Sequence, residues 1–328
     1  MAYRLLMLGT TIVLGLLVWL NFVYDGSAPP PHHPLVGAAF LNSTFSMHHD
    51  PTFRPMMASN ATREDEVCRV QFVFAGPKYD YQRFSVLQTW VRYADPKCTI
   101  EFIRTSHPMF QQLTPAERHV FLGSAYVPIL QADFMKLLVL YYLGGLVTDL
   151  DIEALKPFPD QWTGPTTPLA TCDVVLGIEG NCYDGNNCNM VRKGQIQNWS
   201  TWSRRRHSPF VGQLIEYAVA KFNNFPGAPV QEVFGSGAIT DFVRLYGGFV
   251  DVPHYQAATN ARGATLQKDL KSVLRIQKEG EEVCVVGFKW TGGECSGQSC
   301  LLHHLYEGSW KGDGRPSWWS RFKAAVVG

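Results

Sequence analysis

Residues 128–151 read PILQADFMKLLVLYYLGGLVTDLD, and this stretch decides the fold. Residues 128–143 are almost continuously apolar after a leading proline, which predicts a buried helix. A glycine pair at 144–145 halts this helix. Residues 146–151 are then expected to form a strand that reaches the acidic pair at its end. A helix followed directly by a buried strand is typical of α/β proteins.

The same alternation of strands and helices continues on both sides of this stretch. Apolar and β-branched runs predict strands at 69–74, 98–103 and 174–178. Periodicity and a capping-box sequence predict helices at 81–93, from Thr114 onward, at 209–222 and at 238–246. This order implies an α/β fold with a mainly parallel sheet that is covered on both faces.

Asp149 and Asp151 follow the buried strand, at the kind of strand end where open α/β sheets bind ligands. Side chains two apart on an extended backbone project to the same side, so the carboxylates are expected to lie close together. A hard divalent cation relieves their repulsion and leaves positions for the oxygens of a departing diphosphate. A surface turn and a calcium loop are the alternatives, although Ala154 stands where a hand-type calcium loop needs glycine.

Asp133 and Lys136 lie three residues apart on the preceding helix and therefore on one face of it. The glycine pair allows a sharp turn, so we expect this helix face and the acidic strand end to converge. A plain ion pair between Asp133 and Lys136 is the alternative.

The first part of the chain predicts a membrane anchor. Residues 5–24 are uncharged and mostly apolar, and Arg4 precedes them. About 20 helical residues span the hydrocarbon core of a bilayer, and the positive flank keeps the N-terminal end in the cytosol. We therefore expect a cytosolic tail (1–4), a type II signal anchor (5–24), a lumenal stem (25–66), a catalytic domain (67–320) and a C-terminal tail (321–328). A cleaved signal peptide is the alternative.

Other features agree with a lumenal chain. Acceptor sequons for N-glycosylation begin at Asn42, Asn60 and Asn198. All 8 cysteines lie beyond the anchor, and we expect them to be paired in disulfides. From spacing alone we expect only the local pairs Cys182–Cys188 and Cys295–Cys300. A zinc site is the alternative for these cysteines, and it is disfavoured because the chain has no CxxC pair. The net charge of +1 argues against a nucleic-acid partner.

Three blocks together resemble the DxD sugar-binding region of glycosyltransferase family 32: residues 132–136 (ADFMK), 140–145 (LYYLGG) and 149–151 (DLD). More narrowly, they resemble the Golgi initiation-type α-1,6-mannosyltransferases of fungi. Further blocks agree in order: 175–179 (VLGIE), 197–199 (QNW), 207–210 (HSPF), 235–240 (GSGAIT) and 304–311 (HLYEGSWK). The resemblance covers residues 67–315.

The resemblance implies a GT-A fold, one αβα sandwich that binds a nucleotide sugar at the strand ends with Mn²⁺ or Mg²⁺. It implies that Asp151 ligates the metal directly and that Asp149 contacts the metal shell and the donor. Asp133 and Lys136 would hold hydroxyls of the donor sugar, and His304 is a candidate third metal ligand. The remaining implied residues are Gly144, Gly145, Ser309 and Trp310 on the donor side, and Glu179, His207 and Ser236 as acceptor-side candidates. Ser309 and Trp310 would close over the diphosphate, while Trp310 as a core residue is the alternative.

Three positions depart from the family pattern. Lys136 stands where the family usually has arginine, which replaces a bidentate contact to the sugar with a point contact. Residues 235–237 read Gly-Ser-Gly instead of the commoner Thr-Gly-Pro, which bears on the acceptor side. Residues 74–77 read Phe-Ala-Gly-Pro where Ile-His-Gln-x-Trp is usual, which leaves the nucleotide base open.

We therefore expect a Golgi-type, membrane-anchored glycosyltransferase that moves a hexosyl unit onto a glycan hydroxyl. The donor suggested by the resemblance is GDP-mannose, and the α configuration would be retained. A UDP-hexose-dependent enzyme of the same fold, a glycosidase with paired carboxylates and a calcium-dependent sugar-binding module are the alternatives. The glycosidase fits badly because two acids on one side of a strand cannot flank a scissile bond.

Overall fold

The computed structural model describes residues 67–76, 86–180, 190–248, 273–293, 295 and 298–306, and the backbone of 264–267. The chain divides into two compact units, and the fold below is that of the larger one, Ser46–Asn186 with Arg192–Gly328. The expected anchor, stem and C-terminal tail lie outside the described residues. Within the described ranges, no helix has both the length and the apolar character needed to cross a membrane.

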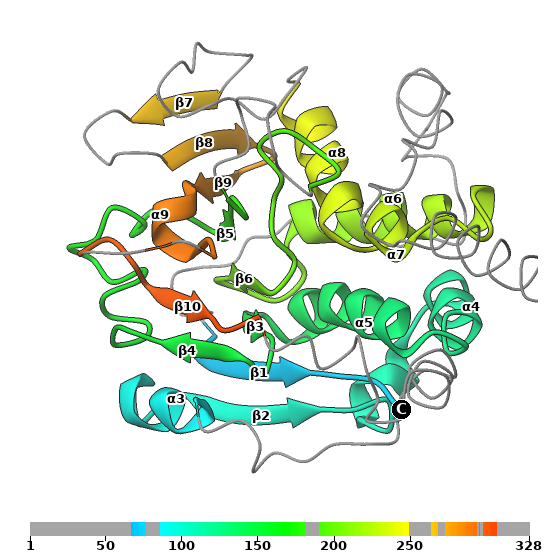
Figure 1. Ribbon diagram of the computed structural model, residues 1–328, viewed down its shortest axis with the longest axis horizontal. Helices are drawn as coiled ribbons and strands as arrows, with labels where there is room; N and C mark the ends of the chain where they lie inside the picture. The colour runs from blue at the N-terminus through cyan, green and yellow to red at the C-terminus, as the bar shows by residue number, and fades with distance from the viewer. Residues whose placement is uncertain are drawn as a thin grey trace, which may run out of the picture. The chain divides into compact units, whose positions relative to one another are not determined.

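The centre of the fold is an eight-stranded mixed sheet in the order β2-β1-β3-β6-β5-β9-β8-β7 (Figure 1). Its strands are β1 (Arg69–Val73), β2 (Thr99–Ile103), β3 (Gly145–Thr148), β5 (Val174–Gly177), β6 (Ser200–Ser203), β7 (Ala264–Gln267), β8 (Val273–Lys278) and β9 (Glu281–Val286). Parallel pairs join β1 to β2, β1 to β3, and β5 to β9. Strands β6 and β8 run antiparallel to both of their neighbours. The expected mainly parallel sheet is therefore confirmed in part, since most strands share one direction and two are reversed.

Register brings the carboxyl ends of β1, β2 and β3 to one edge of the sheet. Phe72 of β1 pairs with Phe102 on one side and with Thr148 on the other. Strands β1 and β3 are short and largely buried, whereas β2 at the edge of the sheet is exposed or half-buried and buries only Ile103. The acidic pair that follows Thr148 consequently lies at this edge.

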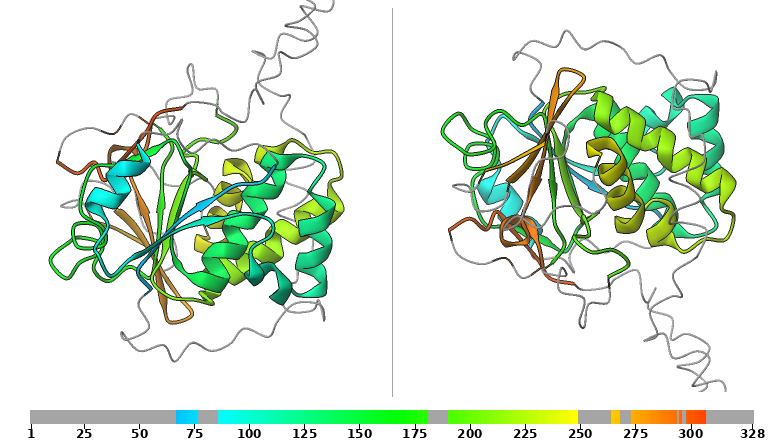
Figure 2. Two further views of the ribbon diagram at one scale, coloured as in Figure 1. Left: turned by 90° about the horizontal axis from the view of Figure 1, so that it is seen from below. Right: turned by 90° about the horizontal axis from the view of Figure 1, so that it is seen from above.

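One face of the sheet carries the helices of the middle of the chain, which lie on the same side of it in both views of Figure 2. They are α4 (Pro115–Gly123), α5 (Pro128–Leu143), α6 (Pro209–Asn224), α7 (Val230–Val233) and α8 (Ser236–Gly247). Helix α5 packs against β1, β3 and β6 on one side and against α4, α6 and α7 on the other, which explains why it is apolar on nearly all sides.

The opposite face carries the 3-residue strands β4 (Ile152–Ala154) and β10 (Leu302–His304) with two short helices, α3 (Leu87–Tyr93) and α9 (Phe288–Thr291). Strands β4 and β10 pair in an antiparallel ribbon outside the main sheet. A core that includes Trp90, Phe158 and Trp162 fills the space beneath. The Trp90 indole nitrogen donates to the Ile152 carbonyl at 2.7 Å, which fixes the start of β4.

Most expected elements are present with shifted ends. Helix α5 covers the predicted residues, and α4 has the complete capping box on Thr114 and Glu117. A 3₁₀ helix at Pro108–Gln112 precedes α4. Sequence reasoning did not predict β6, β7, β8, β9 or β10, and residues 81–85 of the predicted 81–93 helix lie outside the described residues.

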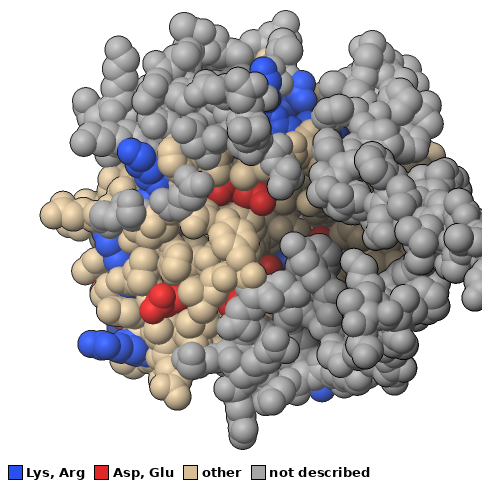
Figure 3. Space-filling view, viewed as in Figure 1, with Lys and Arg blue, Asp and Glu red and all other residues tan. Residues whose placement is uncertain are grey.

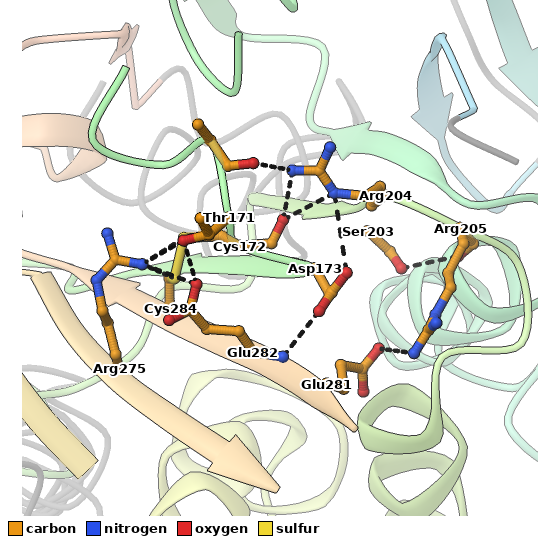
Figure 4. A network of polar contacts seen from close by, with 11 residues as sticks. Thr171, Cys172, Asp173, Ser203, Arg204, Arg205, Arg275, Glu281, Glu282 and Cys284 are labelled. Atoms are coloured by element: carbon orange, nitrogen blue, oxygen red, sulfur yellow. Dashed lines mark hydrogen bonds and ion pairs between the residues drawn. A yellow bond between two sulfur atoms is a disulfide. The ribbon is translucent and has the colours of Figure 1, made fainter. Parts of the chain in front are cut away.

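Three disulfides join described cysteines: Cys68–Cys98, Cys172–Cys284 and Cys295–Cys300. The last confirms one of the two local pairs, while Cys182 and Cys188 lie outside the described residues. The Cys172–Cys284 bridge ties the segment before β5 to β9, and a polar network surrounds it (Figure 4). In this network the Arg275 Nη1 atom donates to the Glu282 carboxylate at 2.8 Å and lies 3.7 Å from each sulfur.

Candidate active site

Asp149 and Asp151 lie in the turn that joins β3 to β4. Strand β3 ends at Thr148, so the expectation that it extends through residue 151 is wrong. The Asp149 N–H donates to the Trp199 carbonyl at 2.9 Å, and Leu150 is buried between the two acids. The turn is therefore anchored to the segment before β6, and acidic side chains are visible near the middle of the face shown in Figure 3.

The two acids have different partners. Lys136 Nζ lies 2.6 Å from Asp149 Oδ1 and 3.2 Å from Asp133 Oδ1, so one ammonium group bridges both carboxylates. The side chains of Lys136 and Asp133 are only 8% and 3% exposed, whereas that of Asp149 is 29% exposed. The face of α5 and the acidic strand end therefore converge, as expected. The ion pair between Asp133 and Lys136, which was the alternative, is present as well.

Asp151 faces His304 instead. Pairing of β10 with β4 places His304 opposite Ile152, next to the acid, and the Leu305 N–H donates to the Asp151 carbonyl at 3.0 Å. The His304 Nε2 atom is 3.3 Å from Asp151 Oδ2, and both side chains are 11% exposed. Among described atoms, the buried Nδ1 of His304 has no hydrogen-bond partner.

Aromatic rings hold the His304 imidazole in place. Its ring centroid is 4.5 Å from that of Trp199 and 4.0 Å from that of Tyr306, and Trp199 and Tyr306 meet edge to face. The Trp199 indole nitrogen donates to the Thr291 carbonyl at 3.3 Å. The imidazole is therefore oriented by packing as well as by Asp151.

The electrostatics of the cluster follow from burial and from its charges. Burial raises the pKa of Asp133 to about 6, although Lys136 opposes this shift. Burial also raises the pKa of Asp149, again against the attraction of Lys136 and with repulsion from Asp151 adding to it. Burial alone would lower the pKa of Lys136, but the two carboxylates outweigh it and raise that pKa. Lys136 therefore stays charged, and the acids carry more negative charge than one lysine neutralises.

Asn198 is a site residue that sequence reasoning missed. Its side chain makes a hydrogen bond with the Asp133 carboxyl. This bond favours the charged form and so opposes the rise in the pKa of Asp133 that burial causes. The sequence interpretation of Asn198 was an N-glycosylation sequon, and only its place as the middle residue of the QNW block could have suggested a second role. The neighbouring Trp199 and Ser200 are buried.

Glu179 and Ser236, two acceptor-side candidates, lie together. Glu179 follows β5 at the same edge of the sheet, and its carboxyl makes hydrogen bonds with Ser236 and with Gln195. His304 acts electrostatically on both Glu179 and Asp149, so the imidazole is close enough to interact with each of these acids.

Three other candidates lie elsewhere. Gly144 and Gly145 form the turn before β3, at the opposite end of that strand from the acids, with φ of 65° and 80°. A Cβ on Gly145 would lie 2.8 Å from Arg69, so these glycines are required by the turn and not by a donor. His207 packs against Tyr141 at a ring distance of 5.0 Å, near the same end of α5, and the structure does not bring it to the acids. Ser309 and Trp310 lie outside the described residues.

The site residues fit a divalent cation of the Mn²⁺ or Mg²⁺ type. Two carboxylates and an imidazole with a buried, unpartnered nitrogen make an oxygen-rich donor set with one nitrogen, which suits Mn²⁺ well. In the described residues, the ligand atoms of Cys172, Glu282 and Cys284 all lie within 4.8 Å of one another, but the two sulfurs are joined in a disulfide and are not free to bind metal. Asp149, Asp151 and His304 do not form so tight a group, so their fit to a cation rests on their chemistry and on the contact between Asp151 and His304.

Comparisons with known proteins agree with this chemistry. Residues 41–168 match the family model described as a glycosyltransferase sugar-binding region containing a DXD motif. The initiation-specific alpha-1,6-mannosyltransferase of Candida albicans is 25% identical in an alignment of 223 positions, and the match covers 57% of this chain and 55% of that protein. This chain therefore matches about half the length of that relative. Among solved structures, the PaToxG glycosyltransferase has 16% identity and a TM-score of 0.37 over 55% of this chain and 69% of its own. The family match confirms the resemblance seen in the motif blocks.

Proposed function

We propose that this chain is a metal-dependent glycosyltransferase of the mannosyltransferase type, supported by the match of residues 41–168 to a DXD-containing sugar-binding region and by the Candida albicans relative. In this proposal it moves a hexosyl unit from a nucleotide sugar onto a glycan hydroxyl with retention of configuration. The observation that carries the proposal is the convergence of Asp149, Asp151, Lys136 and His304 at one sheet edge.

Asp151 and His304 are the residues that would hold Mn²⁺ or Mg²⁺, with Asp149 at the edge of the metal shell. When bound, the metal supplies positive charge for the diphosphate as its bond to the anomeric carbon breaks. Aromatic packing on His304 and the backbone bond of Asp151 to Leu305 keep both ligands in place beforehand.

Asp133, Lys136 and Asn198 are suited to hold hydroxyls of the donor sugar. Lys136 donates to two carboxylates and keeps its charge, and the half-buried Asn198 amide has both a donor and an acceptor. With a lysine here, the contact to the sugar is a single charged donor and not a bidentate fork.

Retention is proposed without a covalent sugar–enzyme adduct. The cluster holds carboxylates that already serve Lys136 and His304, so none is free as a nucleophile. The diphosphate itself would take the proton of the acceptor hydroxyl on the face from which it leaves. Trapping of a glycosyl adduct on a carboxylate such as Glu179 would contradict this step.

GDP-mannose is proposed as the donor, and a Golgi membrane as the location, because the Candida albicans relative is an initiation-specific alpha-1,6-mannosyltransferase. The proposed type II anchor is the apolar stretch 5–24, which lies outside the described residues. The disulfides fit an oxidising lumen.

Calorimetry on the purified full-length protein tests the proposal. We expect GDP and GDP-mannose to bind in the presence of Mn²⁺ and to lose binding when the metal is removed. Asp151→Asn keeps the side-chain volume, removes a metal-binding charge and is expected to abolish the metal-dependent binding, while Asp160→Asn on an exposed turn is the matched control. Preferential binding of UDP-hexoses would show that the donor is a UDP-sugar and not GDP-mannose. Binding of sugars that needs calcium and is unaffected by nucleotides would overturn the enzymatic function.

A further inference from the structure

Glu179 lies at the same edge of the sheet as the turn that carries Asp149 and Asp151. Strand β6 separates β5, which precedes Glu179, from β3, which precedes that turn. Trp202 of β6 pairs with Leu146 of β3 on one side and with Val175 of β5 on the other. Glu179 comes four residues after Val175, and Leu150 comes four residues after Leu146. Two strand spacings amount to about 10 Å, which is room for a sugar ring and a second hydroxyl between the two groups of acids.

The Glu179 carboxylate is held in a fixed position by neutral groups. The Gln195 Nε2 atom donates to Glu179 Oε2 at 2.5 Å, and Ser236 at the start of α8 bonds the same carboxyl. Gln195 is 1% exposed, and its Oε1 accepts from the Arg192 N–H at 3.2 Å. The amide is therefore oriented so that its NH₂ group points at Glu179.

Arg192 anchors this support to the helices. Its guanidinium makes two bonds to Glu232 of α7, at 3.0 and 2.7 Å, and two to Asp241 of α8, at 2.7 and 2.8 Å. The Ile196 N–H also donates to Thr240 of α8 at 2.8 Å. The segment that carries Gln195 is thus hydrogen-bonded to α8, the helix that begins with Ser236.

Glu179 differs from several other enclosed acids of the fold. Glu232 and Asp241 on the adjoining helices, and Glu282 at the far end of the sheet, each have an arginine or lysine within ion-pair distance. Among the described residues, no lysine or arginine forms an ion pair with Glu179. Enclosing a carboxylate among neutral groups costs stability, and a glutamine would serve packing as well. The negative charge is therefore best explained by a ligand.

We propose that Glu179 accepts a hydrogen bond from a hydroxyl of the acceptor glycan and orients it toward the donor sugar at the Asp151–His304 centre. Gln195 and Arg192 are positioning residues that act through Glu179. The exposed ring of Tyr306 lies tilted against His304 of this centre. The inference rests on the proposed transfer function and adds the acceptor-binding group to it; Glu179 forms no bond to the sugar.

The test compares transfer to a glycan with transfer to water. The full-length protein is given Mn²⁺ and GDP-mannose, and the release of free mannose is measured alongside transfer to methyl α-D-mannoside. Glu179→Gln is expected to lower transfer by about 10- to 100-fold, the range for a lost hydrogen bond to a charged group, and to leave hydrolysis of the donor within about twofold. Glu101→Gln on β2, another half-buried glutamate, is the matched control and should change neither rate.

A second variant tests the positioning role. Gln195→Met keeps a similar volume but cannot donate, so we expect a higher KM for the acceptor with an unchanged KM for the donor. Combined with Glu179→Gln it should cause little further loss, because both changes remove the same interaction. A purely structural role would instead lower both activities and add to the first change.

The outcomes separate the two proposals. If Glu179→Gln lowers transfer and hydrolysis equally, or changes neither, the acceptor role of Glu179 is wrong while the transferase function stands. If the unmodified protein neither hydrolyses nor transfers from GDP-mannose or a UDP-hexose, the proposed function fails and the inference fails with it.

Discussion

At the scale of single residues, two aspartates separated by one leucine have different surroundings. Asp149 shares Lys136 with Asp133, and Asp151 faces His304. The residue types and the helical spacing of Asp133 and Lys136 were enough to predict that these acids meet a cation. The division of roles was not predictable, because it depends on a turn where the sequence indicated a strand.

Lys136 is expected to stabilise the fold as well as the site. Lys136→Met leaves the buried carboxylate of Asp133 and the partly exposed carboxylate of Asp149 without their cation and should destabilise the protein by about 3 kcal/mol in urea unfolding. Lys136→Arg keeps the charge and serves as the control, with a much smaller loss expected. Equal stability of the methionine variant and the unmodified protein would show that the ion pairs contribute nothing.

Asn198 is expected to remain unglycosylated although it begins a sequon. Its amide bonds Asp133 inside the site, and the next two residues are buried, so the folded chain cannot present them to a modifying enzyme. Peptide mapping by mass spectrometry with and without glycosidase should find Asn198 unmodified. A glycan at Asn198 on active protein would contradict its placement beside Asp133.

At the scale of elements, the long apolar helices and the buried strands β1, β3 and β5 were predicted, whereas the short polar strands and the buried pair β8 and β9 were missed. Helix α5 needs no context, because its apolar run is longer than any strand. Strand β6 reads Ser-Thr-Trp-Ser and β10 reads Leu-His-His, and neither shows a strand pattern until its partner is known. His304 was predicted from the family motif, whereas the pairing that brings it to Asp151 was not.

Glu281, the first residue of β9, contacts the first turn of α6 and predicts a pH dependence. Its Oε2 accepts from the Phe210 N–H at 2.9 Å, and Arg205 lies 3.7 Å from its other oxygen (Figure 4). Burial raises the pKa of Glu281 above 4.5, so above that pH the folded state holds a proton that the unfolded state has released. Its contribution to stability therefore falls as pH rises from about 4.5 toward neutral.

Glu281→Gln should remove this contribution while keeping an oxygen for the Phe210 N–H. We expect the variant to gain stability relative to the unmodified protein as the pH of urea unfolding is raised from about 4.5 to 7. A difference between the two proteins that stays constant across that range would contradict the assignment.

At the scale of the whole molecule, distant parts of the chain are joined covalently. The Cys172–Cys284 bridge spans a sequence separation of 112 residues, whereas Cys295–Cys300 spans 5. Cysteine counting predicted that pairs form and found the local one. It could not find the long-range bridge, because eight cysteines allow about a hundred connectivities and the deciding neighbourhood exists only in the folded sheet.

Loss of the long-range bridge should cost more stability than loss of the local one. The chain-entropy model gives about 4–5 kcal/mol for Cys172→Ala/Cys284→Ala and about 2 kcal/mol for Cys295→Ala/Cys300→Ala. Denaturant unfolding of both double variants tests this order. The opposite order would mean that the local bridge supports the β10 segment more than its short loop implies.

The ribbon of β4 and β10 has a consequence for biosynthesis. The acids emerge from the ribosome well before the imidazole that faces them, which follows at a sequence separation of 153. A nascent chain or a premature-stop product that ends before β10 would contain every acid of the centre and lack its nitrogen ligand. Such a fragment is expected to compete poorly for manganese, so the centre is completed only once β10 has been made.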